Sequence, residues 1–557
     1  MNRRQFILTS GASLILPSFS YAGNGDWPVI REWDKNEFNK YSKWVENVYD
    51  VKRNGSGKQK TAKFDRLILD DEMNLLNQKS FLESGNNQVS ESDAKLFRAL
   101  CHCGSFPELM FSYFSYRRGL PGVVSKIKPR KGGDIRYSLG NHPVAHIDSV
   151  SFDGTFRDYL QNTITGSDNE YNFVSGNFRT APDLEGTESV PISLDRNFLK
   201  PGSICYNANG HVLVVGKIDD SGEVHFLDSH PDHSITFNQS LSAIPRIKEN
   251  EDGVRGFERC YDGFRNPRLV KIENGKGVYF SNEEMIEYGF SIEQYKLMKK
   301  INDGLLEEKS FPSLVKNRLR TKRENPLEFL ERSTDELKEM FLEREQFVQE
   351  AWKEVLRNGP ITFPNESNSE NIYQANGRWE TWSSPSSDID RRNKYHYILT
   401  TLEDAIDDFP SSERYVYDTG NKVELIQEIH SRKNSLFNEA GINYVSSNGN
   451  VYHLSLSEIE KRLYNLSFDP NHAPELRWGA PENSQEREGM VMLRTPLKSG
   501  GSLSTLESYD KEEILRFNLT RQSTPTSLNP GDNANRKQYQ TIDEMLSGKL
   551  NLIKPNL

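Results

Sequence analysis

Three side chains that can carry out nucleophilic chemistry occur in the order Cys103, His211 and Asp228. A cysteine thiolate attacks carbonyl carbon, and a neighbouring imidazole can take the thiol proton and return it to a leaving amine. A carboxylate bonded to that imidazole holds it in the required tautomer. The order of cysteine, histidine and acid therefore predicts a thiol hydrolase with Cys103 as nucleophile, His211 as base and Asp228 as the group that orients the base.

The residues after Cys103 predict a helix with this cysteine at its start. Apolar side chains recur at helical spacing over residues 106–114, and Gly119-Leu120-Pro121-Gly122 should end the helix. Free backbone N–H groups and the positive end of the helix dipole favour a thiolate at such a position. Cys101 is the alternative nucleophile, but Gly104 and the first helical turn directly follow Cys103, which favours Cys103. The other interpretation is that both are ordinary buried thiols.

The residues after His211 predict a β-hairpin that brings polar side chains back to it. An apolar strand starts at His211, residues 219–222 indicate a turn, and residues 223–228 alternate like a returning strand. In an antiparallel hairpin the start of the first strand lies beside the end of the second. Asp228, His230 and Asp232 should therefore lie near His211, and one of them could hold the imidazole in the required tautomer.

The phrases Lys200-Pro201-Gly202-Ser203 and Gly210-His211-Val212 resemble the NlpC-type branch of the papain-like superfamily, a group of bacterial cell-wall peptidases. In that branch a Pro-Gly-Asp turn precedes the Gly-His-Val strand, so Ser203 departs from the pattern. The segment from Cys103 to Pro121 also resembles secreted bacterial proteins assigned to this superfamily. The matching stretches cover roughly residues 95–270, about a third of the chain, and no single motif among them is specific to the family.

The resemblance implies a papain-like domain, in which the nucleophile helix packs on an antiparallel sheet, and a substrate amide bond in the peptides of peptidoglycan. It places the third catalytic member at Asp228, although the NlpC branch often uses a second histidine, which keeps His230 and His225 as alternatives. Papain binds the oxyanion with a glutamine side chain, and the ten residues before Cys103 contain none. The backbone N–H of Cys103 is expected to serve, with a second donor that no motif identifies.

We expect an α+β fold in five segments. The chain begins with Arg3-Arg4, a mildly apolar stretch and Ser20-Tyr21-Ala22, which together resemble a twin-arginine signal peptide and its cleavage site. A polar lead-in, the catalytic domain, a mainly helical accessory domain and an extended tail should follow. The expected bounds of the five segments are residues 1–22, 23–92, 93–275, 276–490 and 491–557.

The accessory domain is predicted from helical periodicity. A capping box at Ser333-Thr334-Asp335-Glu336 should start a long helix whose apolar face runs from Leu337 to Val355. Two phrases rich in tryptophan and charge, residues 377–382 and 474–479, are either buried anchors or surfaces that bind sugar or peptide. Other helices are expected near residues 390–408, 421–437, 455–466 and 510–517.

Composition excludes several classes of partner. The formal charge of −10 disfavours nucleic acid and anionic lipid. After the signal segment no apolar run reaches the ~18 residues that a spanning helix needs, so we expect a soluble periplasmic or secreted protein with no integral membrane segment. We expect no cofactor and no metal. A rival interpretation is a zinc site, since zinc is ligated by such side chains; its ligands would come from His225, Asp228, His230, Asp232 and His233.

Two further alternatives concern disulfide pairing and function. Cys205 and Cys260 can pair in an exported protein. The absence of the oxyanion glutamine, the presence of Ser203 and the unmatched second half also fit a binding or scaffold protein on a hydrolase fold. Acyl transfer by the same Cys-His pair is a third possibility.

Overall fold

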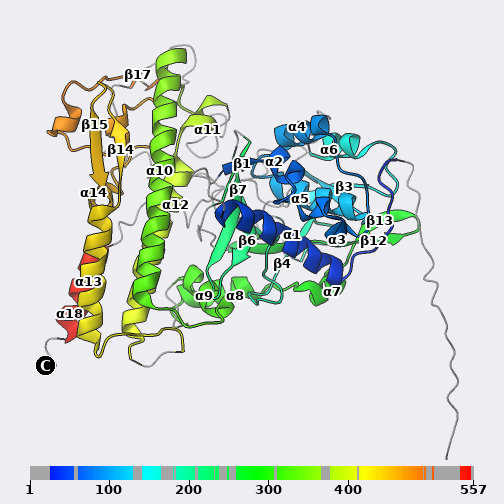
Figure 1. The fold of residues 1–557 in the computed structure, drawn as a ribbon, viewed down its shortest axis with the longest axis horizontal. Coiled ribbons are helices and arrows are strands. Elements are labelled where there is room, and N and C mark those ends of the chain that lie inside the picture. The colour runs from blue at the N-terminus through cyan, green and yellow to red at the C-terminus, as the bar shows by residue number, and fades with distance from the viewer. Residues whose placement is uncertain are drawn as a thin grey trace, which may run out of the picture.

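The computed structural model describes residues 25–54, 61–128, 141–164, 180, 183–206, 211–230, 233–237, 247–249, 259–261, 263–306, 310–364, 377–410, 413–493, 495–496, 505–506 and 540–553. The expected signal segment, the helix expected near residues 510–517, and Asp232 lie outside these residues. The described chain forms two halves that lie side by side in Figure 1, a sheet-containing half over residues 25–319 and a mainly helical half after it.

The sheet-containing half is built on a seven-stranded sheet whose described neighbours pair antiparallel. This combination of helices with antiparallel sheets agrees with the expected α+β class. In spatial order the strands are β1 (Thr61–Lys63), β8 (Ser234–Thr236), β7 (Val224–Ser229), β6 (Val212–Ile218), β5 (Ile204–Tyr206), β11 (Gly263–Pro267) and β4 (Ser189–Pro191).

Both faces of the sheet are covered, as the continuous apolar run of β6 requires. Successive side chains of a strand point to opposite faces. Val214 accordingly belongs to one hydrophobic cluster, whereas Leu213 and Val215 belong to another. The first cluster contains the buried side of helix α5 (Phe106–Arg118), and the second contains Leu297 of helix α8 (Glu293–Asn302) and Phe311 of helix α9 (Phe311–Leu319).

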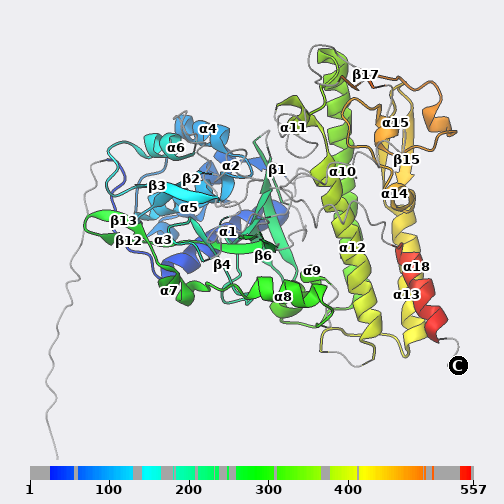
Figure 2. The ribbon, with the colours of Figure 1, turned by 180° about the vertical axis from the view of Figure 1, so that it is seen from behind.

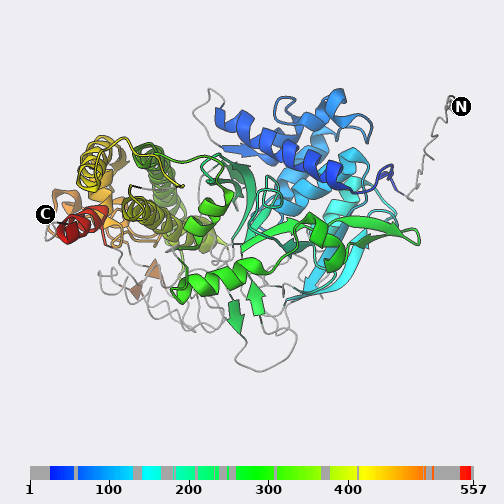
Figure 3. The same cartoon turned by 90° about the horizontal axis from the view of Figure 1, so that it is seen from below.

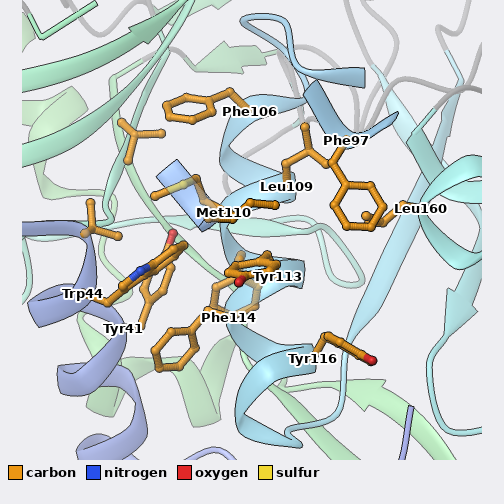
Figure 4. Packing of buried hydrophobic residues seen from close by; sticks show 14 of the residues in the cluster. Tyr41, Trp44, Phe97, Phe106, Leu109, Met110, Tyr113, Phe114, Tyr116 and Leu160 are labelled. Atoms are coloured by element: carbon orange, nitrogen blue, oxygen red, sulfur yellow. The ribbon is translucent and has the colours of Figure 1, made fainter. Parts of the chain in front are cut away.

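Helix α5 confirms the helix that apolar spacing predicts after Cys103. Its side chains meet those of helix α1 (Lys35–Asn54) in an aromatic core, as Figure 4 shows for Tyr41, Trp44 and Phe114. Trp44 and Phe114 have ring centroids 5.9 Å apart. The helix ends at Gly119, whose φ of 65° is left-handed and whose N–H caps the last turn.

The expected boundary at residue 92 differs from the structure. Strand β1 belongs to the central sheet, and Trp27, Trp33 and Trp44 are buried in the same core as α5. The 20-residue helix α1 was not predicted, because its aromatic side chains are separated by many charged residues. The described residues between 25 and 92 are therefore part of the sheet-containing half and not a separate lead-in.

The second expected boundary, at residue 275, also differs. Helices α8 and α9 cover the sheet face that carries Leu213 and Phe226, so the first half continues to about residue 319. The remaining elements of this half are α2 (Phe64–Leu69), η1 (Leu75–Asn77), α3 (Lys79–Leu82), α4 (Glu91–Leu100), β2 (Val123–Lys128), β3 (His142–Asp148), α6 (Phe156–Ile164), β9 (Ile247–Glu249), β10 (Arg259–Tyr261), β12 (Val270–Glu273), β13 (Lys276–Tyr279), α7 (Asn282–Met285) and η2 (Ile286–Tyr288).

The mainly helical half has its own hydrophobic core. Figures 1 and 2 show its long helices running side by side, and Figure 3 views them nearly end-on. No helix in the described part of the chain is both long and apolar enough to cross a membrane. Its elements are α10 (Pro326–Asn358), α11 (Arg378–Trp382), α12 (Pro385–Asp407), α13 (Lys422–Glu439), β14 (Gly441–Val445), β15 (Val451–Ser455), α14 (Leu456–Arg462), α15 (Pro474–Arg477), η4 (Gln485–Arg487), β16 (Thr495–Pro496), β17 (Thr505–Leu506) and α18 (Ile542–Ile553).

The capping box expected at Ser333–Glu336 is wrong. Helix α10 starts at Pro326, and the side chain of Asn325 accepts a hydrogen bond from the backbone N–H of Leu327. Proline at the first helical position and asparagine before it form a stronger start signal than the later Ser-x-x-Glu. The predicted apolar face is correct, since Leu337 and Val355 are both buried.

The extended tail is also wrong for its last described residues. Helix α18 buries Ile542, Met545 and Leu546 in the core of the helical half. The backbone N–H of Ile542 donates to the hydroxyl of Tyr395, which fixes the start of this helix on α12. The chain end thus completes the helical core.

A buried cluster of charges joins the two halves. Glu223, at the turn between β6 and β7, lies 3.4 Å from the Nζ of Lys394 on α12 and accepts a hydrogen bond of 2.7 Å from the Tyr397 hydroxyl. Lys394 also pairs with Glu336 of α10 at 2.6 Å, and Lys316 of α9 lies 3.5 Å from Glu223. Because these charges are out of water, each depends on its partners for stabilisation.

Removing one of these charges should destabilise the fold. We expect Lys394→Met to lower the free energy of unfolding by about 3–5 kcal/mol, because Glu223 and Glu336 lose a buried partner. Urea unfolding followed by circular dichroism and by tryptophan fluorescence measures the change. The matched control is Lys322→Met, which breaks the exposed ion pair with Asp220 near the same turn and should change little. Equal effects of the two substitutions would contradict the assignment.

Candidate active site

The structure brings Cys103, His211 and Asp228 together. Cys103 is half-buried in the turn between α4 and α5, three residues before the first residue of α5. His211 directly precedes β6, and Asp228 is the residue before the last in β7, opposite Leu213 in the strand register. The helix and the hairpin predicted from the sequence therefore deliver the three side chains to one place.

The turn that carries Cys103 is held by Ser105. The Ser105 hydroxyl donates to the carbonyl of Leu100 at 2.6 Å and accepts from the backbone N–H of His102 at 3.0 Å. The backbone N–H groups of Ser105 and Phe106 both donate to the His102 carbonyl. Since Phe106 is fully buried in the core, the turn is fixed at its far end as well.

His211 and Asp228 form a close ion pair. The Nε2 of His211 lies 2.5 Å from the Oδ1 of Asp228. Burial alone would lower the pKa of His211, but the Asp228 carboxylate and the Cys103 thiol raise it well above its usual value. With Nε2 bonded to the carboxylate, Nδ1 is the ring nitrogen left for the thiol. This is the arrangement that a base oriented by an acid requires.

The Cys103 thiol is strongly acidic. Burial would raise its pKa, but hydrogen bonds with the His102 and His211 imidazoles lower the pKa of Cys103 to about 5. Burial instead raises the pKa of Cys101 to about 12, and its sulfur lies 3.3 Å from the Ser229 hydroxyl. Of the two candidate nucleophiles, only Cys103 has the environment of a reactive thiolate.

The other candidate partners of His211 lie farther away. The Nε2 of His230 lies 3.7 Å from the Oδ2 of Asp228 and 3.0 Å from the Thr236 hydroxyl. His225 is buried on β7 beside Tyr49, and its Nε2 lies 3.3 Å from Asp219. In the described part of the chain Asp228 is thus the acid bonded to His211, and the Nε2 of His230 lies near the other oxygen of Asp228.

The side chains considered as zinc ligands bond to different partners. His225 pairs with Asp219, and His233 bonds the Cys101 carbonyl through Nδ1 at 2.8 Å. Within the described residues, no group of three or more histidine, cysteine and acidic side chains has the arrangement of a metal site. Asp232, the fifth expected ligand, lies outside these residues.

Sequence reasoning missed His102 and considered His233 only as a zinc ligand. His102 precedes Cys103 and contributes to the lowered pKa of its thiol, and His233 bonds the carbonyl of Cys101. Their positions near Cys103 depend on the turn held by Ser105 and on the end of β7, which returns the chain to this turn. No sequence motif predicts either feature. The only sequence signal was the position of His102 next to Cys103.

Two other expectations concern residues outside the site. Cys205 is buried in β5, and the side chain of Cys260 lies outside the described residues, so their pairing stays a prediction. Trp379 and Trp478 are buried, and Trp478 contacts Phe341 and Tyr444 in the helical core. These two tryptophans are therefore anchors of the helical half.

The pH dependence of alkylation should follow from the lowered pKa. We expect iodoacetamide to label Cys103 with a midpoint near pH 5, so that its rate is nearly constant from pH 6 to 8. The rate of an ordinary thiol falls about a hundredfold between pH 8 and pH 6. The labelled residue is located by mass spectrometry. His211→Ala should move the midpoint upwards, and a wild-type midpoint in the ordinary thiol range would contradict the assignment.

A matched pair of variants identifies the partner of His211. Asp228→Asn keeps the size of the side chain but removes the charge that raises the pKa of His211. The imidazolium is then less stable, and the Cys103 thiolate loses part of its stabilisation. We expect its labelling midpoint to rise by about one pH unit or more, which corresponds to ~1.4 kcal/mol per unit. His230→Ala should shift the midpoint less. A larger shift in His230→Ala would transfer the orienting role to His230.

Comparison with known proteins found no relative of this chain. No family model, no curated protein and no solved structure matches it. The case for the site therefore depends on the residues and contacts described above, and on the resemblance carried by the motifs around Cys103 and His211.

Proposed function

We propose that this protein is an exported cysteine hydrolase that cleaves an amide bond in cell-wall peptides. The observation that carries the proposal is the Cys103 thiol beside His211, with Asp228 bonded 2.5 Å from the far nitrogen of that imidazole. Such a triad is the chemistry of thiol hydrolases. The lowered pKa of Cys103 supports the proposal further, because a cysteine with a purely structural role does not require an ionised sulfur.

The proposed reaction proceeds in two stages. The Sγ of Cys103 attacks the carbonyl carbon, a C–S bond forms, and the carbonyl electrons move to oxygen. The oxyanion collapses, the C–N bond breaks, and the His211 imidazolium gives its proton to the leaving amine. Water then attacks the acyl-enzyme while His211 takes its proton. Collapse of the second intermediate releases the acid and restores the Cys103 thiolate beside protonated His211.

The papain-like domain belongs to the proposal and is supported by three features. A helix directly follows the nucleophile, an antiparallel sheet carries the base and the acid, and they occur in the family order. The departure at Ser203 is also accommodated. Its hydroxyl accepts from the backbone N–H of Lys200 at 3.1 Å and donates to the side chain of Asn266 at 2.7 Å, so a polar group still closes this turn.

The substrate and the compartment come from the sequence resemblance. An export signal in residues 1–22 would deliver the enzyme to the periplasm or the cell exterior, where peptidoglycan is the abundant source of peptide bonds. An acidic chain is also a better match for a peptide or glycan than for nucleic acid. We therefore place the cleaved bond within, or next to, the peptidoglycan stem.

Two alternatives use the same residues. A binding or scaffold protein is disfavoured by the acidic Cys103 thiol, whose charge has no use in simple binding. Acyl transfer would follow the same steps up to the acyl-enzyme, after which an amine attacks in place of water. Added amine acceptors distinguish these outcomes, because transfer gives a joined product and hydrolysis does not.

Digestion of purified peptidoglycan sacculi tests the proposal. We expect Cys103→Ala and His211→Ala to lose more than about 10³-fold of the activity, and Asp228→Asn to lose about 10²–10⁴-fold. Released fragments are separated by liquid chromatography and identified by mass spectrometry. Cys101→Ala is the matched control, because it removes a neighbouring thiol that takes no part in the reaction, and it should keep most of the activity. Full activity in folded Cys103→Ala would refute the proposal.

A further inference from the structure

The hairpin of β7 and β8 begins its turn beside the proposed site. Asp228, near the end of β7, bonds His211 at 2.5 Å. Two backbone hydrogen bonds of 2.9 Å close the turn that follows, one from the N–H of His230 to the Ser234 carbonyl and one from the N–H of His233 to the His230 carbonyl. The turn therefore starts two residues after the acid that orients the base.

His233 has a strained backbone conformation in this turn. Its φ of 64° lies in the left-handed region, which residues with a Cβ seldom adopt. Glycine takes this conformation without steric cost and is the usual residue at such a place in a tight hairpin turn. Strain of this kind occurs most often at functional sites. The side chain of His233 is therefore the place to look for a function.

That side chain contacts the segment that carries Cys103. It is half-buried, and its Nδ1 lies 2.8 Å from the carbonyl oxygen of Cys101. Because a carbonyl only accepts, Nδ1 carries a proton and donates the hydrogen bond. Cys101 is the C-cap residue of α4, where the last carbonyls have no partner within the helix. His233 thus satisfies one of these carbonyls from a distant part of the chain.

Three successive carbonyls lead from the end of α4 through the turn that carries Cys103. The Leu100 carbonyl accepts from the Ser105 hydroxyl at 2.6 Å, and the His102 carbonyl accepts from the backbone N–H of Ser105. Both of these bonds are internal to the turn. The Cys101 carbonyl lies between them in the chain, and its bond from His233 ties the turn to the hairpin of β7 and β8.

We propose that His233 is a positioning residue, which holds the turn of the proposed nucleophile in register with the base. Asp228 of the hairpin fixes His211. His233 of the same hairpin fixes the backbone two residues before Cys103. The attraction between a thiolate and an imidazolium weakens as they separate, so this register determines how fully the Cys103 thiol ionises. His233 acts through the backbone of the nucleophile segment.

Two substitutions separate the side-chain contact of His233 from its backbone conformation. His233→Gly fits the left-handed backbone but removes the donor. His233→Asn places an N–H donor on Cγ, the atom that carries Nδ1 in histidine, and asparagine also tolerates the left-handed region. Iodoacetamide labelling of Cys103 is measured across pH for both variants of the full chain. Thermal unfolding is followed by circular dichroism.

We expect His233→Gly to raise the labelling midpoint of Cys103 by about one pH unit or more, because the turn is no longer held beside the imidazolium. Its melting temperature should stay within about 3 °C of the wild-type value, since glycine relieves the backbone strain. His233→Asn should retain the wild-type midpoint.

Two control variants should also keep the wild-type midpoint. Cys101→Ala loses the sulfur that contacts Ser229 but keeps the carbonyl that His233 bonds. Asn274→Gly introduces glycine at another residue with positive φ, in the exposed turn between β12 and β13. An unchanged midpoint in His233→Gly, an equal rise in His233→Asn, or a large fall in the melting temperature of His233→Gly would overturn the proposal.

This inference rests on the proposed function, but it fails separately from it, because alkylation by iodoacetamide needs no substrate. If the midpoint rises in His233→Gly and is restored in His233→Asn, the positioning role stands even where sacculi are not cleaved. If sacculi are cleaved and the midpoint of His233→Gly is unchanged, the hydrolase stands and His233 does not position its nucleophile.

Discussion

The bond between Asp228 and His211 determines the charge state of the whole site. Burial opposes charge on Cys103, His211 and Asp228, and the charges of the neighbouring groups shift the pKa of each toward its ionised form. The carboxylate stabilises the imidazolium, and the imidazolium stabilises the thiolate. Loss of the Asp228 carboxylate would therefore raise the pKa of the Cys103 thiol, although the two groups need not be in contact. Three weak groups thereby become one strongly polarised unit.

This unit depends on a hairpin that is anchored at both ends. At the turn, Glu223 is enclosed by Lys394 and Tyr397 of α12 in the helical half and by Lys316 of α9 in its own half. At the open end, Asp228 bonds His211, and its neighbour Ser229 contacts the sulfur of Cys101. Strands β6 and β7 thus connect the junction of the two halves to the turn that carries Cys103. The helical half has a structural part in holding the site, because it supplies most of the charges around Glu223.

Sequence reasoning succeeded where one local pattern decided the outcome. The spacing of Phe106, Leu109 and Met110 predicted helix α5, and the alternation after Glu223 predicted the returning strand. It failed where two signals competed or where polar residues diluted a pattern. Helix α10 starts after Asn325 and not at the capping box expected at Ser333. Helix α1 was not predicted, because charged residues separate its aromatic side chains. The boundaries of the halves were misplaced for the same reason, since strand β1 and helices α8 and α9 join the sheet from outside the expected segment.

The amino-acid sequence by itself determined the identities and the order of the groups that we propose to react, and the local elements that carry them. Cys103 precedes a helix and His211 begins a hairpin because short-range periodicity is encoded in neighbouring residues. Only the tertiary structure decided which acid reaches His211 and which cysteine has a lowered pKa. These choices depend on distances of a few ångströms between segments far apart in the chain. Hydrogen bonds and charges act over such distances, and only packing of the whole core sets them.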